Sequence, residues 1–221
     1  MPGPIHRQSY NASNSEKAPD GRLFAPSFER NSNPIIAILK QYLGDASGQV
    51  LEIGCGTGQH VSACAMAMPH LAWQASDPYP QHRASADAWA THLATDLPPA
   101  IDLDAAQEWA PQVAELSPVR AVISMNVIHI APFIVTEGII AGAAKVLAPQ
   151  GLLIFYGPFR VDGKHTSQGN IDFDAALRRD NPDWGIRDIS ELEAFATPRG
   201  LILEHAQPMP ANNRTLIFRK S

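Results

Sequence analysis

The segment LEIGCGTGQH, residues 51–60, contains the clearest candidate for a functional site in this chain, judged by residue types and spacing. Three glycines, Gly54, Gly56 and Gly58, alternate with other residues directly after a short apolar run, and Glu52 precedes them. Glycines after a strand allow backbone angles that other residues avoid, and they let a ligand approach the main chain closely. A helix that follows such a turn directs its free N–H groups at the ligand. The segment therefore predicts a turn that binds a ligand.

Two classes of ligand are compatible with a glycine-rich turn, and Gln59 and Glu52 separate them. A dinucleotide fold requires G-x-G-x-x-G or a final alanine, and Gln59 stands at that final position. Its bulk would prevent the close helix–strand packing that the third glycine normally allows. The carboxylate of Glu52 suits a ligand that carries an ammonium group and would repel a pyrophosphate. A nicotinamide-dependent oxidoreductase is therefore the weaker alternative.

A second acid, Asp77, stands in the segment ASDPYP beyond the glycines. In dinucleotide folds an acid about 20 residues further on takes the ribose hydroxyls of the bound nucleotide. The alternative is a local role, in which the carboxylate caps a helix or closes an Asx-turn before Pro78. Both interpretations stay open at this point.

Short apolar runs that alternate with helical patterns must position these residues. The predicted strands are Val50–Ile53, Leu71–Ala75, Ala100–Leu103, Ala121–Met125 and Leu152–Tyr156, and the predicted helices lie near 58–68, 81–94, 105–114 and 133–147. Such alternation is typical of a mostly parallel sheet with helices on both faces. In sheets of this kind the ligand binds in a crevice at the carboxyl ends of the strands.

The two ends of the chain depart from this alternation. A helix around 188–198 precedes Leu201–His205 and Thr215–Phe218, which are interpreted as a hairpin, so the last strand is expected to be antiparallel. Near the other end, Asn33 as N-cap and Pro34 in the first turn predict the start of a helix.

Residues 1–32 are interpreted as an arm that precedes this helix. The arm lacks hydrophobic periodicity but contains Phe24, Phe28 and Arg30. Because a solvated tail would not need two phenylalanines so close together, we expect the arm to fold over the ligand as a lid. The alternative is an arm that only packs on the edge of the sheet.

Length and composition bound the class of protein. The chain has 221 residues, 45% of them hydrophobic and 18% charged, which is typical of one globular domain spanning residues 1–221. The formal charge of −5 gives no basic footprint for nucleic acid. The cysteines Cys55 and Cys64 lack metal-ligand spacing, and no stretch predicts a signal peptide or a membrane span. We expect a cytoplasmic protein without a metal site, a membrane segment or a nucleic-acid partner.

The segment LEIGCGTGQH resembles the first motif of class I S-adenosylmethionine-dependent methyltransferases, and ASDPYP, VLAPQGLLIF and the closing hairpin follow in the order of that superfamily. The segments RLFAPSFERNSNPI, MPHLAWQASDP, NVIHIAP, YGPFRVDGKHT and MPANN resemble one compact methyltransferase-like branch of it, which is found from bacteria to animals and whose substrates are mostly unassigned. The resemblance covers roughly residues 30–221. It implies an α/β fold with a Rossmann-like, doubly wound, seven-stranded sheet, mostly parallel with an antiparallel C-terminal strand.

The resemblance implies S-adenosylmethionine as cofactor and S-adenosylhomocysteine as product. In the family, the acid before the glycines holds the amino end of the methionine moiety, the next acid holds the ribose, and an acid near the third strand holds adenine. Carried over to this chain, the cofactor-binding residues are Arg30, Glu52, Gly54, Gly56, Gly58, Asp77, Pro78, Asp102, Leu103 and Asn126. Asp96 and Asp104 remain alternatives to Asp102, and Arg30 is expected near the cofactor's carboxylate.

Asn126 and His129 follow the fourth predicted strand. Related enzymes that methylate base amines or amide nitrogens often carry (Asn/Asp)-Pro-Pro-aromatic here, whereas this chain has Asn-Val-Ile-His. The difference disfavours nucleobase-amine and protein-glutamine substrates, and the missing Pro-Cys pair disfavours a cysteine nucleophile. His129 either caps and packs at the start of the next helix or acts as the base that takes the substrate's proton.

The loops after the later strands are expected to meet the substrate. Tyr156 and Asn212 are the predicted substrate contacts, and the stretch from Tyr156 to Asn170 is a second candidate lid. No recognition domain remains outside the core, so the expected reaction is methyl transfer to oxygen, nitrogen or sulfur of a small molecule. The alternatives are a protein or RNA methyltransferase that works with a partner, and a scaffold that binds the cofactor without catalysis.

Overall fold

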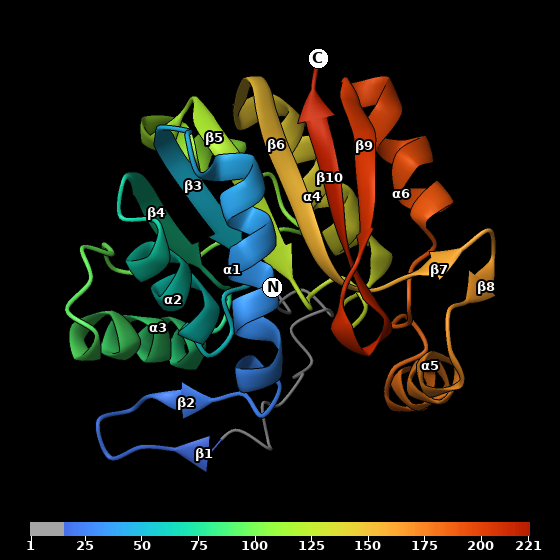
Figure 1. Ribbon diagram of the computed structural model, residues 1–221, viewed down its shortest axis with the longest axis horizontal. Coiled ribbons are helices and arrows are strands. Elements are labelled where there is room, and N and C mark those ends of the chain that lie inside the picture. Colours follow the sequence, from blue (N-terminus) through green and yellow to red (C-terminus); the bar gives the residue numbers. More distant parts are fainter. Residues whose placement is uncertain (1–15) are drawn as a thin grey trace, which may run out of the picture. The chain divides into compact units, whose positions relative to one another are not determined.

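A computed structural model describes residues 16–221, which pack as two compact units that divide between Asp104 and Ala105. In the first unit, β3 and β4 pair as parallel strands and β1 and β2 form a small antiparallel ribbon (Figure 1). Helix α2 packs against β4 and against both other helices of the unit. The elements are β1 (Glu16–Lys17), β2 (Leu23–Phe24), α1 (Phe28–Leu43), β3 (Gly48–Ile53), α2 (Gln59–Ala67), β4 (Leu71–Ser76) and α3 (Pro80–His92).

In the second unit the strand order is β5-β6-β10-β9, with β10 antiparallel to both neighbours. Helices α4 and α6 cover one face of these strands, behind them in Figure 1. The elements are the 3₁₀-helix η2 (Ala110–Leu116), β5 (Val119–Met125), α4 (Phe133–Val146), β6 (Leu147–Pro158), β7 (Arg160–Val161), β8 (Lys164–His165), α5 (Gln168–Asp180), α6 (Ile189–Ala196), η3 (Thr197–Arg199), β9 (Leu201–Pro208), η4 (Pro210–Asn212) and β10 (Asn213–Lys220). Within residues 16–221, no helix has the length and apolar character needed to cross a membrane.

The core of the second unit follows from continuous apolar runs in its central strands. Residues 121–123 of β5, 152–155 of β6 and 216–218 of β10 are buried almost completely. Strands with both faces covered need such unbroken apolar runs, whereas a strand with one wet face would alternate. Phe155 and Phe218 pack edge to face, with ring centroids 6.2 Å apart, and join β6 to β10. The predicted fold class and the antiparallel last strand are confirmed.

Among residues 16–221, six strands take part in the mixed sheet instead of the seven predicted. The predicted strand Ala100–Leu103 is wrong, because only one parallel bridge forms there, between Ser76 and Ile101. Pro98 and Pro99 precede this segment, and prolines donate no ladder hydrogen bond. The chain therefore touches the edge of β4 at one point and then leaves it.

Two predicted helix starts are also wrong, and a proline is involved in each. Helix α1 begins at Phe28 and contains Pro34 in its interior, so the irregular arm ends at Ser27 and not at residue 32. Burial of Asn31 inside the unit fixes the early turns despite the hydrogen bond that Pro34 cannot make. The predicted helix at 105–114 is the later 3₁₀-helix η2, which starts one residue before Pro111, where a missing N–H costs nothing.

The stretch from Tyr156 to Asn170, predicted as a loop, contains the β7–β8 hairpin and the start of α5. The N-cap of α5 is Ser167, whose hydroxyl accepts a hydrogen bond from the Asn170 amide at 3.1 Å. The buried positions of α5 are Asn170, Asp174 and Leu177, two of which are polar. Its hydrophobic stripe is therefore too weak to reveal a helix from periodicity.

Helix α4 offers a test of core packing at Gly142. Trp109 is 1% exposed and donates its indole N–H to the Gly138 carbonyl at 2.8 Å, which lays the ring over Gly142. A Cβ at Gly142 would overlap the indole. We expect Gly142→Ala to lower the free energy of unfolding by about 1–3 kcal/mol in urea denaturation, as overpacking does. The control is Gly169→Ala in α5, because the nearest atom to a Cβ added at Gly169, the Ser167 hydroxyl oxygen, is 3.9 Å away. Equal stability of the two variants would contradict the packing described.

Candidate functional site

The glycine turn has the backbone geometry that its sequence predicts. Gly54, Gly56 and Gly58 have φ angles of +76°, +54° and +80°, a region in which side chains with a Cβ are strained. The amides of Gly54 and Cys55 both donate to the Ser76 carbonyl at 2.9 Å, which ties the turn to the end of β4. Helix α2 begins directly after Gly58 and directs its free amides toward the turn.

The glycines of this turn differ in what surrounds them. A Cβ at Gly58 would collide with the main chain of Ala86, so this glycine allows α2 to pack against α3. A Cβ at Gly56 would meet no atom within 4 Å. Gly58 is therefore needed by the fold, whereas Gly56 borders open space that a ligand can occupy.

Asp77 holds the glycine turn from the end of β4. Its carboxylate is 3% exposed and accepts hydrogen bonds from the Gly56 amide at 3.0 Å and the Tyr79 amide at 2.9 Å. Nδ1 of His82 lies 3.1 Å from the same carboxylate. The Tyr79 contact is the Asx-turn that the sequence offered as an alternative, so Asp77 has a structural role. Its contact with Gly56 also places the carboxylate beside the open space.

Glu52 is a buried acid without a counter-charge among residues 16–221. The residue is 1% exposed, and its Oε2 has no hydrogen-bond partner in the described part of the chain. Burial, and secondarily the charge of Asp77, raise the pKa of Glu52 to about 8. An unpaired buried carboxylate is costly, and a bound cation removes that cost. The acid at this turn therefore fits a ligand with an ammonium group, and the assignment of Glu52 to that group stays a prediction.

The three acids considered for adenine differ in exposure. The Asp102 side chain is 58% exposed and lies 3.3 Å from the Arg83 guanidinium, which also donates to the Asp77 carbonyl at 2.9 Å. Asp104 is buried, Asp96 is exposed, and Leu103 is completely buried. Arg83 thus connects Asp102 with the end of β4. The choice of Asp102 stays a prediction.

The segment before α1 contacts the glycine turn through Gln59 and Ser85. The Ala25 amide donates to the Gln59 side chain at 2.6 Å, and the Leu23 amide donates to the Ser85 hydroxyl at 2.8 Å. That hydroxyl in turn donates to the carbonyl of Thr57, inside the turn, at 2.7 Å. Sequence reasoning missed Ser85, because nothing in the pattern of α3 marks a serine that bridges two distant segments.

An aromatic contact adds to this attachment of the arm. The Trp89 indole donates to the Leu23 carbonyl at 2.9 Å, and its ring meets Phe24 edge to face with centroids 5.1 Å apart. The guanidinium of Arg22 lies 4.7 Å from the Trp89 ring. Arg30 lies on the exposed side of α1, where its Nε donates to the Asn31 side chain at 3.3 Å. The part of the arm before Glu16 lies outside the described residues.

In the second unit, Asn126 and His129 lie around Gly157. Asn126 ends β5 with a left-handed φ of +58° and donates its amide to the Tyr156 carbonyl at 2.8 Å. A Cβ at Gly157 would lie 3.4 Å from Nδ1 of His129 and 3.5 Å from Oδ1 of Asn126. These distances place both polar side chains, which follow β5, beside Gly157 of β6. Non-glycine residues in left-handed conformations are often found at functional sites.

The imidazole of His129 is buried and neutral. The residue is 4% exposed, and its ring packs edge to face on Phe173 with centroids 5.6 Å apart. Burial, and secondarily the charge of Arg187, lower the pKa of His129 to about 4. Its Nδ1 has no hydrogen-bond partner among the described residues. A neutral imidazole with an unpaired nitrogen is the form in which histidine accepts a proton.

The two predicted substrate residues lie in different surroundings. Tyr156 is 3% exposed, and its hydroxyl accepts a hydrogen bond from the Asn213 side chain at 3.0 Å. Asn212 is exposed, and its carbonyl accepts from the Asn170 side chain at 3.3 Å. The residue beside Tyr156 is thus Asn213. The register of the sheet explains this contact. Thr215 pairs with Tyr156, and Asn213 points to the same face of β10 as Thr215, because it lies two residues away.

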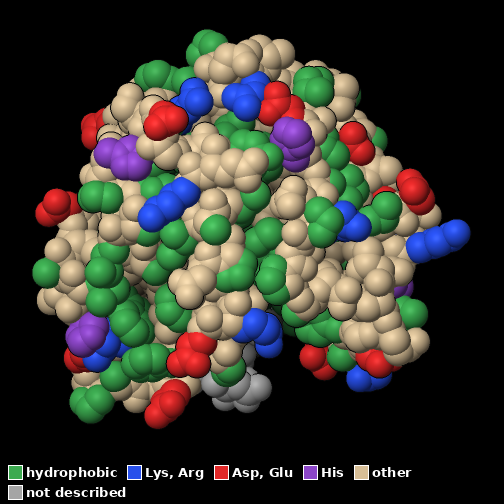
Figure 2. Space-filling view, viewed as in Figure 1, with side chains coloured by type: hydrophobic (Ala, Val, Ile, Leu, Met, Phe, Trp, Pro, Cys, Tyr) green, Lys and Arg blue, Asp and Glu red, His purple; other side chains and the backbone are tan. Residues whose placement is uncertain are grey.

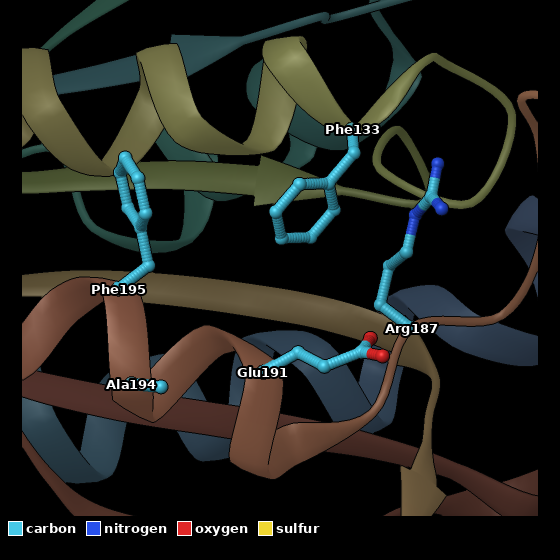
Figure 3. A pocket seen from close by; sticks show the side chains of 5 residues that line it. All are labelled: Phe133, Arg187, Glu191, Ala194 and Phe195. Carbon is cyan, nitrogen blue, oxygen red and sulfur yellow. The ribbon is translucent and has the colours of Figure 1, made fainter.

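A cavity of about 450 Å³ lies in the second unit (Figure 3). Its lining residues are Phe133, Arg187, Glu191, Ala194 and Phe195, none of which the sequence predicts as a site residue. The structure thus brings together Glu52, Asp77 and the glycine turn in the first unit. In the second unit it brings together Asn126 and His129.

Three solved structures that resemble this one are named as methyltransferases. An O-methyltransferase family protein from Burkholderia thailandensis matches with a TM-score of 0.74 and 17% identity over 88% of this chain and 57% of that chain. The O-methyltransferase NcsB1 from neocarzinostatin biosynthesis, solved with S-adenosylmethionine and 2-hydroxy-5-methyl naphthoic acid, matches with a TM-score of 0.68 and 16% identity over 88% and 54%. Magnesium protoporphyrin IX methyltransferase (ChlM) from Synechocystis PCC 6803 was solved with S-adenosylhomocysteine. It matches with a TM-score of 0.65 and 17% identity over 86% of this chain and 82% of that chain.

These likenesses show that the protein has the Rossmann-like fold of class I methyltransferases, as the sequence predicts. The chain spans little more than half the length of the first two of these proteins. It belongs to the family described as "Protein of unknown function (DUF938)", whose pattern matches residues 22–220.

Glu52 makes the stability of the unliganded protein depend on pH. Its pKa is about 8 in the folded protein against an ordinary value of 4.5, so the unfolded chain binds fewer protons between these values. The free energy of unfolding should therefore fall as pH rises, by about 3 kcal/mol between pH 4.5 and 7 from this group. We expect Glu52→Gln to remove this slope in urea denaturation across pH. Glu29→Gln, at an exposed position of α1, is the control and should keep the slope.

Proposed function

We propose that the protein binds S-adenosylmethionine and transfers its methyl group to a small molecule, with a hydroxyl oxygen as the first candidate acceptor. The observation that carries the proposal is the unpaired, buried carboxylate of Glu52 beside a glycine turn that has open space at Gly56. The ammonium group of the methionine moiety supplies the missing positive charge. Solved relatives that are named as O-methyltransferases support oxygen over nitrogen and sulfur.

The first unit supplies the residues that would hold the cofactor. Glu52 would bind the ammonium group, and the turn from Gly54 to Gly58 would lie against the methionine and ribose. Asp77 would accept from the ribose hydroxyls beside Pro78, because one lone pair remains on the oxygen that bonds Gly56. Asp102 would accept from the adenine amino group while the Leu103 backbone pairs with the ring, and Arg30 is proposed near the carboxylate.

Bound S-adenosylmethionine supplies a methyl group on a positively charged sulfur, which leaves as a neutral thioether. The protein therefore has no leaving group to protonate. Its task is to align the acceptor with the methyl carbon and to exclude water. The rigid turn and the buried Glu52 fix one side of this alignment. Asn126 is proposed among the residues that hold the cofactor, and His129, Tyr156 and Asn212 are proposed for the acceptor.

His129 would take the proton that the acceptor loses. Its pKa of about 4 keeps the imidazole neutral at pH 7, so the base form is present before reaction. An alcohol or phenol oxygen becomes strongly acidic once it forms a bond to the methyl carbon. A weak base such as His129 is then sufficient, because the proton moves late, after carbon–oxygen bonding has begun.

A cytoplasmic location and a small-molecule partner complete the proposal. Cys55 and Cys64 are free and buried, and unpaired cysteines suit a reducing compartment. On the face drawn in Figure 2, acidic and basic side chains are interspersed, and the net charge is −5. This distribution supports a small molecule over nucleic acid as partner.

Binding of S-adenosylmethionine tests the proposal directly. Calorimetric titration should show binding to the wild type, and both Asp77→Ala and Gly56→Ala should weaken it by about tenfold or more. Gly56→Ala fills the open space that the ligand needs. Gly163→Ala is the matched control, because Gly163 also has a positive φ and no atom within 4 Å of an added Cβ, but lies between β7 and β8 in the second unit.

The same titration separates the alternatives. Dinucleotide binding in place of S-adenosylmethionine would assign the turn to an oxidoreductase. Cofactor binding without a methylated product in a substrate screen would support the non-catalytic scaffold. Equal affinities of Gly56→Ala and Gly163→Ala would overturn the proposed cofactor site.

The arm is proposed to order the cofactor site through Ser85 and Gln59. Deleting residues 1–26 leaves α1 intact and removes the donors to both side chains. We expect the deletion to weaken S-adenosylmethionine binding by about tenfold, and Ser85→Ala to weaken it less, since one of two attachments remains. Ser47→Ala, at an exposed serine of the same unit, should bind as the wild type. Wild-type affinity after the deletion would reduce the arm to packing alone.

A further inference from the structure

The loop that carries His129 is held by a segment more than fifty residues later in the chain. Nε of Arg187 donates to the Ile128 carbonyl at 3.1 Å, and its Nη2 donates to the Ala131 carbonyl at 2.6 Å. Between them, the Gly185 amide donates to the carbonyl of His129 itself at 2.9 Å. Three carbonyls of the four-residue loop 128–131 are therefore bound by residues 185–187.

Arg187 is buried, and its guanidinium donates to main-chain carbonyl oxygens. The residue is 9% exposed, and its third carbonyl partner is Asp183 at 2.8 Å. In Figure 3 the guanidinium points away from the Glu191 carboxylate and toward the loop before α4. That carboxylate accepts instead from the Asp188 amide at 3.1 Å. The guanidinium also lies 5.4 Å from the ring centre of Phe133.

The segment that presents Arg187 is itself fixed by α5. The Asp174 carboxylate accepts from the Ile186 amide at 2.6 Å and from Nε of Arg178 at 3.0 Å. A Cβ at Gly185 would overlap Arg178 and Asp174, so the main chain runs directly against α5 there. The Arg187 side chain therefore starts from a rigid main chain.

A buried guanidinium is costly to place, and its planar set of donors can reach several acceptors at once. Arginines at such depth normally pair with a carboxylate or phosphate. Here Nε and Nη2 donate to main-chain carbonyls of loop 128–131, which has no regular secondary structure of its own. An arrangement of this kind restricts the position of the loop, and with it the position of the His129 ring.

We propose that Arg187 is a positioning residue for His129, which fixes the imidazole by binding the carbonyls on both sides of it. The proposal rests on the proposed function, in which His129 takes the proton of the acceptor. Sequence reasoning did not single out Arg187. It stands in the segment WGIRD, where no spacing relates it to NVIHIAP.

The charge of Arg187 acts on His129 together with the geometry. Burial is the main cause of the lowered pKa of His129, and the Arg187 charge adds to it. The charged groups that act on Arg187 are Arg178, Glu191, Asp174 and Arg160. Removing the guanidinium should therefore change two properties of His129, the fixed orientation of the ring and its pKa.

The experiment follows the imidazole of His129 by NMR in the full-length protein, across pH and without substrate. His129→Gln identifies the signal among those of the eight histidines. Arg187→Met removes the charge and all donors, and Arg187→Lys keeps the charge but cannot bind two carbonyls with a planar fork. Arg199→Met is the matched control, because Arg199 also lies over a phenylalanine, Phe195, and donates to a carbonyl, that of Phe195.

The wild type and Arg199→Met should show one sharp His129 signal with a pKa of about 4. In Arg187→Met we expect a broadened or split signal and a pKa that moves toward 6.5, the ordinary value. In Arg187→Lys we expect broadening with a smaller pKa change. If Arg187→Met does not fold, broadening in Arg187→Lys carries the test. A sharp, unshifted His129 signal in a folded Arg187 variant would overturn the proposal.

Calorimetry on the same samples separates this proposal from the proposed function. S-adenosylmethionine should bind the Arg187 variants as it binds the wild type, because the guanidinium donates to Ile128, Ala131 and Asp183 and to no proposed cofactor residue. Once a substrate is found, Arg187→Lys should lower kcat with little change in the KM for the cofactor. A wild-type protein that binds no cofactor, with a His129 signal that still depends on Arg187, would refute the proposed function alone.

Discussion

Two buried carboxylates at the ends of neighbouring parallel strands, Glu52 and Asp77, set the constraint on which the first unit depends. Burial and mutual repulsion disfavour two charges there, and the fold compensates only one of them. Asp77 receives donors from Gly56 and Tyr79, and in doing so fixes the glycine turn. Glu52 keeps an oxygen without a partner in the described chain. A cation that enters beside Gly56 would give the ionised form of Glu52 its counter-charge, so a positively charged ligand offsets the burial that raises the pKa of this acid.

The second unit shows the opposite relation between charge and burial. There a buried base, His129, is kept neutral by burial and by a nearby cation, Arg187. The first unit thus holds an acid that gains from a positive ligand, and the second holds a base that is free to accept a proton. Each property depends on main-chain geometry that a distant side chain fixes, Asp77 for the turn and Arg187 for the loop.

The sequence predicted the elements whose signals are local, and it failed where tertiary contacts or prolines decide. The strands β3 to β6 and helices α2, α3 and α4 were found because their apolar runs and periodicities need no partner to be recognised. The start of α1 was predicted at Pro34, because the burial that holds the turns before this proline could not be inferred. The start of η2 was predicted too early, because 3₁₀ geometry before Pro111 could not be inferred either. In the candidate site, the glycines were predicted from backbone physics alone. The contacts of Ser85, Asn213 and Arg187 join segments far apart in the chain, so no spacing could indicate them.

The attachment of the arm has an optical consequence. Of the four tryptophans in the chain, Trp73, Trp109 and Trp184 are buried in the interior, whereas Trp89 is partly exposed and covered by the arm through Arg22, Leu23 and Phe24. Its indole emission is therefore sensitive to whether the arm is in place, against a background from three shielded rings. The protein carries its own fluorescent reporter of the arm, beside the turn that the arm contacts, and docking can be followed in solution without a label.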